Sequence, residues 1–116
     1  MQEQPLEIER MDGPAGTSIL RLHGPLLLGN FFSFQSIVRS DEANLLILDL
    51  SDVPYIDSAG IGCLVGAHVS RENSHRKLIV AGAGERVQNA LKVTRVDQLF
   101  TFAPDIEQAK AQAGAA

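Results

Sequence analysis

The most constraining stretch of the chain is an apolar run, Leu45-Leu46-Ile47-Leu48-Asp49-Leu50, which a turn and a helical pattern soon follow. The run shows no alternation between apolar and polar residues, which is typical of a central strand covered on both faces. From about Ser58 to Glu72 the apolar residues recur at helical spacing instead. A buried strand that leads through a short turn into a helix predicts an α/β arrangement, with residues 54–62 as the connection.

The other segments alternate between strand-like and helix-like patterns. The expected order is β-β-α-β-α-β-α-(β)-α, a hairpin followed by βα units, which predicts one mixed sheet with helices packed on it. Asn30 is the expected N-cap of the first helix, and Pro104-Asp105 opens the last one. The expected strands cover residues 6–11, 17–23, 45–50, 77–81 and 99–102, and the earlier helices cover 30–39, 58–72 and 85–92.

The length of 116 residues is that of about one domain. We therefore predict a single α/β domain over residues 1–116, with a mixed sheet of about four or five strands and about four packed helices. Residues 1–4 and 112–116 are expected to be frayed.

Composition excludes several classes of partner. The net charge is −4, the basic residues are scattered, and aromatic residues are scarce. Nucleic-acid binding requires a clustered basic face or stacking rings, so direct nucleic-acid contact is not expected. No apolar run approaches the ~20 residues that span a bilayer, and residues 1–5 lack the features of a signal peptide. We expect no membrane insertion and a cytoplasmic location.

Catalytic and metal-binding patterns are missing from the sequence. The histidines lack metal-ligand spacing, and Cys63, the single cysteine, is expected to be a buried, inert thiol. Ile56 stands where a nucleophile elbow around Ser58 would need glycine. The glycine-rich turn at residues 81–86 lacks the third glycine of a dinucleotide loop, with Val87 in its place. We therefore expect no enzyme activity, no metal and no cofactor.

Ser58 stands at a predicted strand-to-helix turn. A serine there is a good N-cap, worth about 1 kcal/mol relative to alanine. Gly60 and Gly62 allow close approach of the backbone. The free N–H groups of a first helical turn, together with the helix dipole, also favour an anion at this place. The local sequence therefore has two interpretations, a structural cap or a site that accepts a negative group.

Residues 48–50 and 55–64 together resemble the signature of the STAS domain, and more narrowly that of bacterial anti-anti-sigma factors (anti-sigma factor antagonists). Residues 57–62 match its D-S-x-G-[LI]-G core in full. Weaker similarities extend over most of the chain: a Leu-x-Gly that ends the second strand, the later strand at 78–80, and the closing Leu99-Phe100. The resemblance implies a STAS-like fold for the whole chain.

The resemblance also implies a regulatory role for Ser58. In that family the matching serine is phosphorylated by a partner that is both an anti-sigma factor and a serine kinase, and a serine phosphatase restores it. The unphosphorylated antagonist binds the anti-sigma factor and releases a sigma factor, and ATP belongs to the kinase. Carried over by position, Ser58 is the phosphorylation site and Asp57 its acidic neighbour, and the partner-facing turn consists of Ala59, Gly60, Ile61 and Gly62.

Two segments depart from the family pattern. Residues 25–28 read Pro-Leu-Leu-Leu where the family commonly has a polar, often acidic, residue, and we expect Leu27 and Leu28 to contact the partner. Residues 93–97 lack the glycine often found in the family before the final Leu-Phe. We expect this difference to affect only the packing of the segment. Phe32 falls off the apolar side of the first predicted helix, either as a partly exposed ring or as a partner contact.

Two alternative functions stay open. A STAS subunit that supports a membrane transport complex, or a component of a larger signalling assembly, is the second hypothesis, with the apolar loop 26–28 as its docking surface. A small nucleotide-binding or hydrolytic enzyme that uses Ser58 or the loop at 82–84 is the third, and the missing motifs disfavour it.

Overall fold

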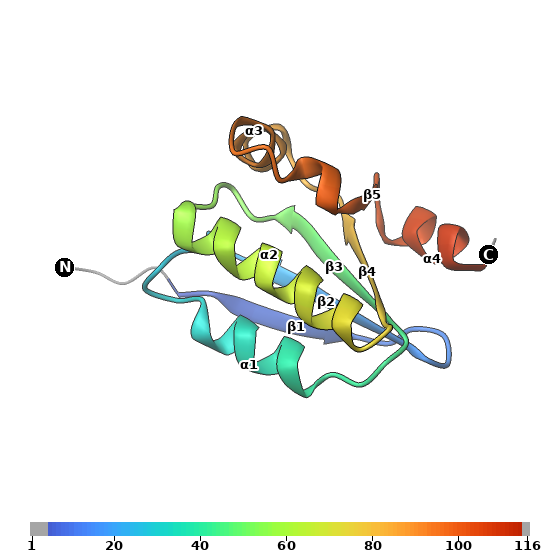
Figure 1. The fold of residues 1–116 in the computed structure, drawn as a ribbon. Helices are drawn as coiled ribbons and strands as arrows, with labels where there is room; N and C mark the ends of the chain where they lie inside the picture. The colour runs from blue at the N-terminus through green and yellow to red at the C-terminus, as the bar shows by residue number, and fades with distance from the viewer. Residues whose placement is uncertain (1–4, 115–116) are drawn as a thin grey trace.

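The apolar run at residues 45–50 lies in the middle strand of a five-stranded sheet, as predicted (Figure 1). The computed structural model describes residues 5–114. The strands follow chain order across the sheet, with β1 antiparallel to β2 and every other neighbouring pair parallel. Their bounds are Glu7–Met11 (β1), Thr17–His23 (β2), Leu45–Asp52 (β3), Lys77–Ala81 (β4) and Thr101–Ala103 (β5).

Within residues 5–114, four helices accompany the strands in the predicted order, which confirms the α/β class. The apolar piece expected at 99–102 divides into a 3-10 turn, Asp97–Leu99, and the short strand β5. Fraying was expected for residues 1–4 and 112–116; the last helix continues to Gly114, and residues 1–4 and 115–116 lie outside the described residues. The helices are Phe32–Ser40 (α1), Ser58–Asn73 (α2), Glu85–Val93 (α3) and Ile106–Gly114 (α4).

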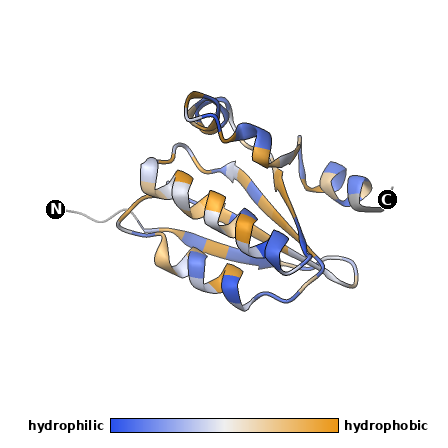
Figure 2. Ribbon diagram, in the orientation of Figure 1, coloured by the Kyte–Doolittle hydropathy of each residue, from blue (hydrophilic) through white to orange (hydrophobic). Residues whose placement is uncertain are grey.

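Both faces of the sheet are covered by helices, and each face has its own apolar core. One core lies under α1, α2 and α3 and includes Leu20, Leu46 and Leu48. The other lies under α4 and includes Ile19 and Ile47. Figure 1 shows α1 and α2 side by side against the sheet, and Figure 2 shows hydrophobic residues dominating β4. Since consecutive residues of β3 point into different cores, the strand needs no polar alternation.

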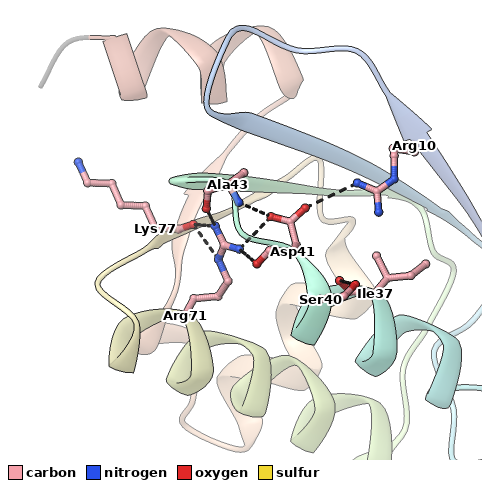
Figure 3. Close-up of polar contacts among 7 residues, drawn as sticks. All are labelled: Arg10, Ile37, Ser40, Asp41, Ala43, Arg71 and Lys77. Atoms are coloured by element: carbon pink, nitrogen blue, oxygen red, sulfur yellow. Dashed lines mark hydrogen bonds and ion pairs between the residues drawn. The ribbon is translucent and has the colours of Figure 1, made fainter.

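A buried ion pair lies at the end of the sheet where β3 and β4 begin (Figure 3). The side chains of Arg71 and Asp41 expose only 2% and 3% of their surface, and Arg71 Nη1 lies 3.1 Å from Asp41 Oδ1. Arg71 Nη2 also donates to the carbonyl oxygens of Ala43 and Lys77, at 2.7 and 3.1 Å. One side chain of α2 therefore holds the connector before β3 and the first residue of β4.

Desolvation offsets much of the attraction within this pair. Burial lowers the pKa of Arg71 in spite of the neighbouring carboxylate. Burial acts to raise the pKa of Asp41, but hydrogen bonds from Ser18, the Ala43 N–H and Arg71 outweigh it, and the pKa of Asp41 is lowered. Pairs of this kind contribute little net stability while both partners are present, yet removal of one partner leaves a buried charge without compensation.

Replacing Arg71 with methionine is expected to lower the free energy of unfolding by about 3–5 kcal/mol, because the buried Asp41 would lose its buried cationic partner and be left with the exposed Arg10 at 3.6 Å. Urea denaturation followed by circular dichroism measures the change. The double variant Arg71→Met/Asp41→Leu should recover much of the loss. Arg39→Met, at an exposed position of α1, is the control and should stay within about 0.5 kcal/mol of the parent. Equal losses at Arg71 and Arg39 would contradict this role.

Candidate functional site

Ser58 is the first residue of α2, and residues 53–57 lead to it directly from the end of β3. The residue is exposed. Within the described range 5–114, no hydrogen bond to its hydroxyl group is found. The Ser58 hydroxyl is therefore available to another molecule.

Asp57 is the N-cap of α2, so of the two interpretations of Ser58 the structural cap is wrong. Asp57 has extended backbone angles (φ −99°, ψ −175°), and its Oδ1 accepts a hydrogen bond from the Gly60 N–H at 2.8 Å. Aspartate caps helices about as well as serine does, and here it occupies the last extended position before the helix. Because Asp57 caps the helix through the Gly60 N–H, the Ser58 hydroxyl is not needed as a cap.

The second carboxylate oxygen of Asp57 binds the loop between β2 and α1. We call residues 25–30 the apolar loop, because they include the apolar residues 26–28. Asp57 Oδ2 accepts a hydrogen bond from the Leu28 N–H at 3.1 Å. The Asp57 N–H in turn donates to the Leu26 carbonyl oxygen at 3.3 Å, and Leu26 forms a parallel bridge with Ile56. The apolar loop therefore lies directly against the turn that presents Ser58.

Asn30 braces the same loop, and the prediction that it caps α1 is wrong. Its side chain accepts a hydrogen bond from the Leu27 N–H and donates one to the Pro25 carbonyl oxygen, both at 2.8 Å. The residue before α1 is Phe31, whose backbone is already helical and whose side chain makes no cap. Asparagine side chains bind nearby backbone in turns as readily as at helix ends, and here the turn takes the side chain.

Two glycines of the motif serve different purposes. Gly60 is buried where α2 meets the apolar loop, and a Cβ at this position would overlap the Leu26 carbonyl oxygen. A Cβ at Gly62 would meet nothing within 4 Å. Gly60 is therefore required by the contact between helix and loop, whereas Gly62 leaves the helix backbone open to solvent.

The residues predicted to face a partner differ in exposure. Phe32, predicted to lie off the buried side of its helix, is 70% exposed, and Leu28 is 67% exposed. The Phe31 and Phe32 rings stack with their centroids 4.6 Å apart. Of the predicted set, Ser58, Gly62 and Leu28 are exposed; Asp57, Ala59, Ile61 and Leu27 are half-buried; and Gly60 is buried.

Comparison with known proteins identifies the fold. The model of the STAS domain family matches residues 7–109. The chain belongs to the STAS domain family. The anti-sigma-B factor antagonist of Listeria monocytogenes is 31% identical to it over 64 residues, which cover 55% of this chain and 56% of that protein. This STAS domain thus aligns with about half the length of the curated relatives it matches.

Solved structures show the same fold. An anti-sigma factor antagonist from Mycobacterium paratuberculosis superimposes with a TM-score of 0.78 at 18% identity, over 96% of this chain and 95% of that one. Phosphorylated SpoIIAA from Bacillus gives 0.72 at 14%, over 92% and 99%. The murine anion transporter Slc26a9 gives 0.80 at 22%, over 99% of this chain and 23% of that one. These identities establish the STAS fold alone.

A contact that the sequence did not reveal joins α3 to the turn of this STAS domain. The guanidinium group of Arg86, in the first turn of α3, lies over the Tyr55 ring, 5.1 Å from the ring centroid. Such cation–π contacts contribute about 0.5–1 kcal/mol at exposed sites. No local pattern links the two residues, because they belong to separate elements.

The other candidate residues of the STAS domain do not join the Ser58 turn. Cys63 is buried, as predicted, and burial raises its pKa to about 11. His68 is half-buried, with Nε2 2.9 Å from Glu72 Oε2. Gly82 has a φ of +68° and Gly84 precedes α3, which accounts for the glycine-rich turn. Among residues 5–114 there is no metal-binding group of His, Cys, Asp or Glu, and no helix suited to crossing a bilayer.

Gly60→Ala is expected to lower the free energy of unfolding by about 1–3 kcal/mol, because the new methyl group would overlap the Leu26 carbonyl and force the loop outward. Gly62→Ala is the matched control on the same helix. It should raise the free energy of unfolding by up to about 1 kcal/mol, since alanine is the better helix former and the space is open. Urea titration measures both. Similar values for the two variants would contradict the assigned role of Gly60.

Proposed function

We propose that this STAS domain is an anti-sigma factor antagonist that binds an anti-sigma factor while Ser58 is unphosphorylated and is switched off by phosphorylation of Ser58. The observation that carries the proposal is the exposed Ser58 hydroxyl, free of hydrogen bonds within residues 5–114, at the start of a helix that Asp57 caps. The names of relatives support it, since the Listeria protein is an anti-sigma-B factor antagonist and SpoIIAA was solved in a phosphorylated form.

A phosphate on Ser58 would leave the fold intact. The hydroxyl makes no hydrogen bond in the described structure, so its modification breaks none. The N–H groups of the first helical turn and the helix dipole stabilise a negative group at this end by about 0.3–1 kcal/mol. The nearby Asp57 carboxylate opposes the phosphate, but it already accepts two backbone hydrogen bonds.

The effect of the phosphate falls on the interface. A phosphoserine adds about −1.5 to −2 charges, beside Asp57 and next to the exposed, apolar Leu28. A partner that covers this surface must remove water from that charge, at a cost of several kcal/mol where no cation compensates. Each ~1.4 kcal/mol changes affinity tenfold. Tight binding thus becomes weak binding without a conformational change.

The partner is an anti-sigma factor with serine kinase activity, and a serine phosphatase reverses the modification. The kinase supplies ATP, so the STAS domain has no enzymatic role and needs no cofactor of its own. The partner's contact surface consists of Ser58 with Asp57, Ala59, Gly62, Leu27 and Leu28 around it, while Gly60 and Ile61 shape the turn from within.

Ser58→Ala should bind the anti-sigma factor as tightly as the unphosphorylated protein, and should stay bound in the presence of ATP. Ser58→Asp should bind at least about tenfold more weakly, corresponding to ~1.4 kcal/mol, while its thermal unfolding is unchanged. Calorimetric titration with the purified anti-sigma factor measures the affinities. Ser70→Asp, at an exposed position near the other end of α2, is the control for added charge. Equal affinities of Ser58→Ala and Ser58→Asp would refute the switch.

A subunit or module of a membrane transporter is the second candidate, favoured by the superposition on part of Slc26a9. Incubation with a candidate kinase and ATP, followed by mass spectrometry, separates the two functions. Phosphate confined to Ser58 supports the antagonist, whereas co-purification with a transporter subunit and no phosphorylation supports the second function.

A further inference from the structure

His23, the last residue of β2, lies between two carboxylates that come from different strands. Its Nδ1 is 2.6 Å from Asp52 Oδ2, at the end of β3, and its Nε2 is 2.9 Å from Glu9 Oε1, in β1. β1 is one of the two edge strands of the sheet, and within residues 5–114 it pairs only with β2. One imidazole ring therefore connects three neighbouring strands of the sheet.

The two contacts together require a doubly protonated ring. A neutral imidazole carries one N–H and presents a lone pair at its other nitrogen. In the neutral form one of the two carboxylates would face that lone pair and lose its hydrogen bond. Both contacts are satisfied at once only by the imidazolium, which donates from Nδ1 to Asp52 and from Nε2 to Glu9.

The register of the sheet creates this arrangement. Arg21 pairs with Asp49 in the β2–β3 ladder, but a register shift places His23 opposite Asp52. Irregularities of this kind re-aim a side chain. Arg21 binds Asp49 through Nε at 2.7 Å, so Arg21 and Asp49 neutralise one another beside the histidine.

Carboxylates outnumber cations among the charged groups that face His23. On β1 these are Glu9 and Glu7, which is its register partner; on β3 it is Asp52; on β2 the nearest cation is Arg21. Hydrogen bonds to Asp52 and then to Glu9 raise the pKa of His23 above its ordinary value, against a smaller opposing effect of desolvation.

The Asp52 contact lies at the root of the turn that carries Ser58. Asp52 ends β3, and its carbonyl oxygen accepts a hydrogen bond from the Gly24 N–H at 3.1 Å. Residues 53–57 then run to the start of α2 beside the apolar loop, which itself continues from β2. A change at His23 therefore acts where the loop and the turn both begin.

We propose that His23 is a protonation-dependent clamp, in which an imidazolium bound to Glu9 and Asp52 at once ties the edge strand β1 to the root of the Ser58 turn. Loss of one proton releases one of the two carboxylates, so the ring no longer ties β1 to Asp52 and residues 53–57. The clamp is a property of the isolated domain and goes beyond its binding of an anti-sigma factor. A group with a raised folded-state pKa contributes its stabilisation fully below its unfolded-state pKa, near 6.5, and loses it as the pH rises through the folded-state value.

An NMR titration of the full unphosphorylated chain tests the clamp. The titration midpoint of His23 should lie above that of the same residue in urea-unfolded chain, and Glu9→Gln and Asp52→Asn should each lower it. Glu7→Gln is the matched control, because Glu7 faces His23 in the ladder but makes no hydrogen bond to it among the described residues. The backbone amides of residues 53, 55, 56 and 57 should shift with the same midpoint, and His23→Gln should abolish that shift.

Either of two results would overturn the clamp. One is a His23 midpoint that Glu9→Gln and Asp52→Asn leave unchanged, and the other is amide shifts at 53–57 that do not follow the His23 titration. Ser58→Ala should titrate like the parent. Because no partner or phosphate takes part in the measurement, failure of the clamp and failure of the proposed phosphorylation are separate results.

Discussion

The candidate site depends on the hydrogen bonds that the Asp57 carboxylate accepts. One of its oxygens caps α2 through the Gly60 N–H, and the other holds the Leu28 N–H of the apolar loop. Both oxygens are therefore used by backbone donors from segments that are far apart in the chain. A serine hydroxyl has one oxygen and could not bind both donors in the same way. Asp57 thus joins the start of α2 to the apolar loop, while the Ser58 hydroxyl beside it makes no hydrogen bond within residues 5–114.

The two ends of the sheet are stabilised in different ways. At the start of β3 and β4, the buried Arg71 donates hydrogen bonds to the Asp41 carboxylate and to backbone carbonyl oxygens (Figure 3). At the other end, the contacts around Ser58 are single backbone hydrogen bonds and the half-exposed His23 cluster. The first end resists local opening more than the second, because its polar groups are shielded from water. The proposed partner surface around Ser58 and the His23 side chain both lie at the second end.

Under the proposed function, this division would let a charge at Ser58 act as a switch without unfolding the domain. The two cores lie between the sheet and the helices on each of its faces, and the exposed Ser58 belongs to neither core. A charge added at Ser58 would change the surface that a partner contacts and leave the packing of the two cores unchanged. The apolar loop contributes the exposed Leu28 to the same surface. Under the proposed function, a partner would cover Leu28 and a kinase would modify Ser58.

The order of the elements, the buried middle strand and the place of Ser58 could all be predicted from the sequence, because each depends on residues within a few positions of one another. Hydrophobic periodicity and a capping motif are local patterns. The sequence was ambiguous where two local roles competed: Asn30 braces a turn rather than capping a helix, and Asp57 takes the cap from Ser58. Tertiary structure alone decided the contacts between distant residues, with separations of 29 for Asp57 with Leu28, 30 for Arg71 with Asp41, and 29 for His23 with Asp52. No pattern along the chain records such pairs, since strand order and register place them together only after the sheet has formed.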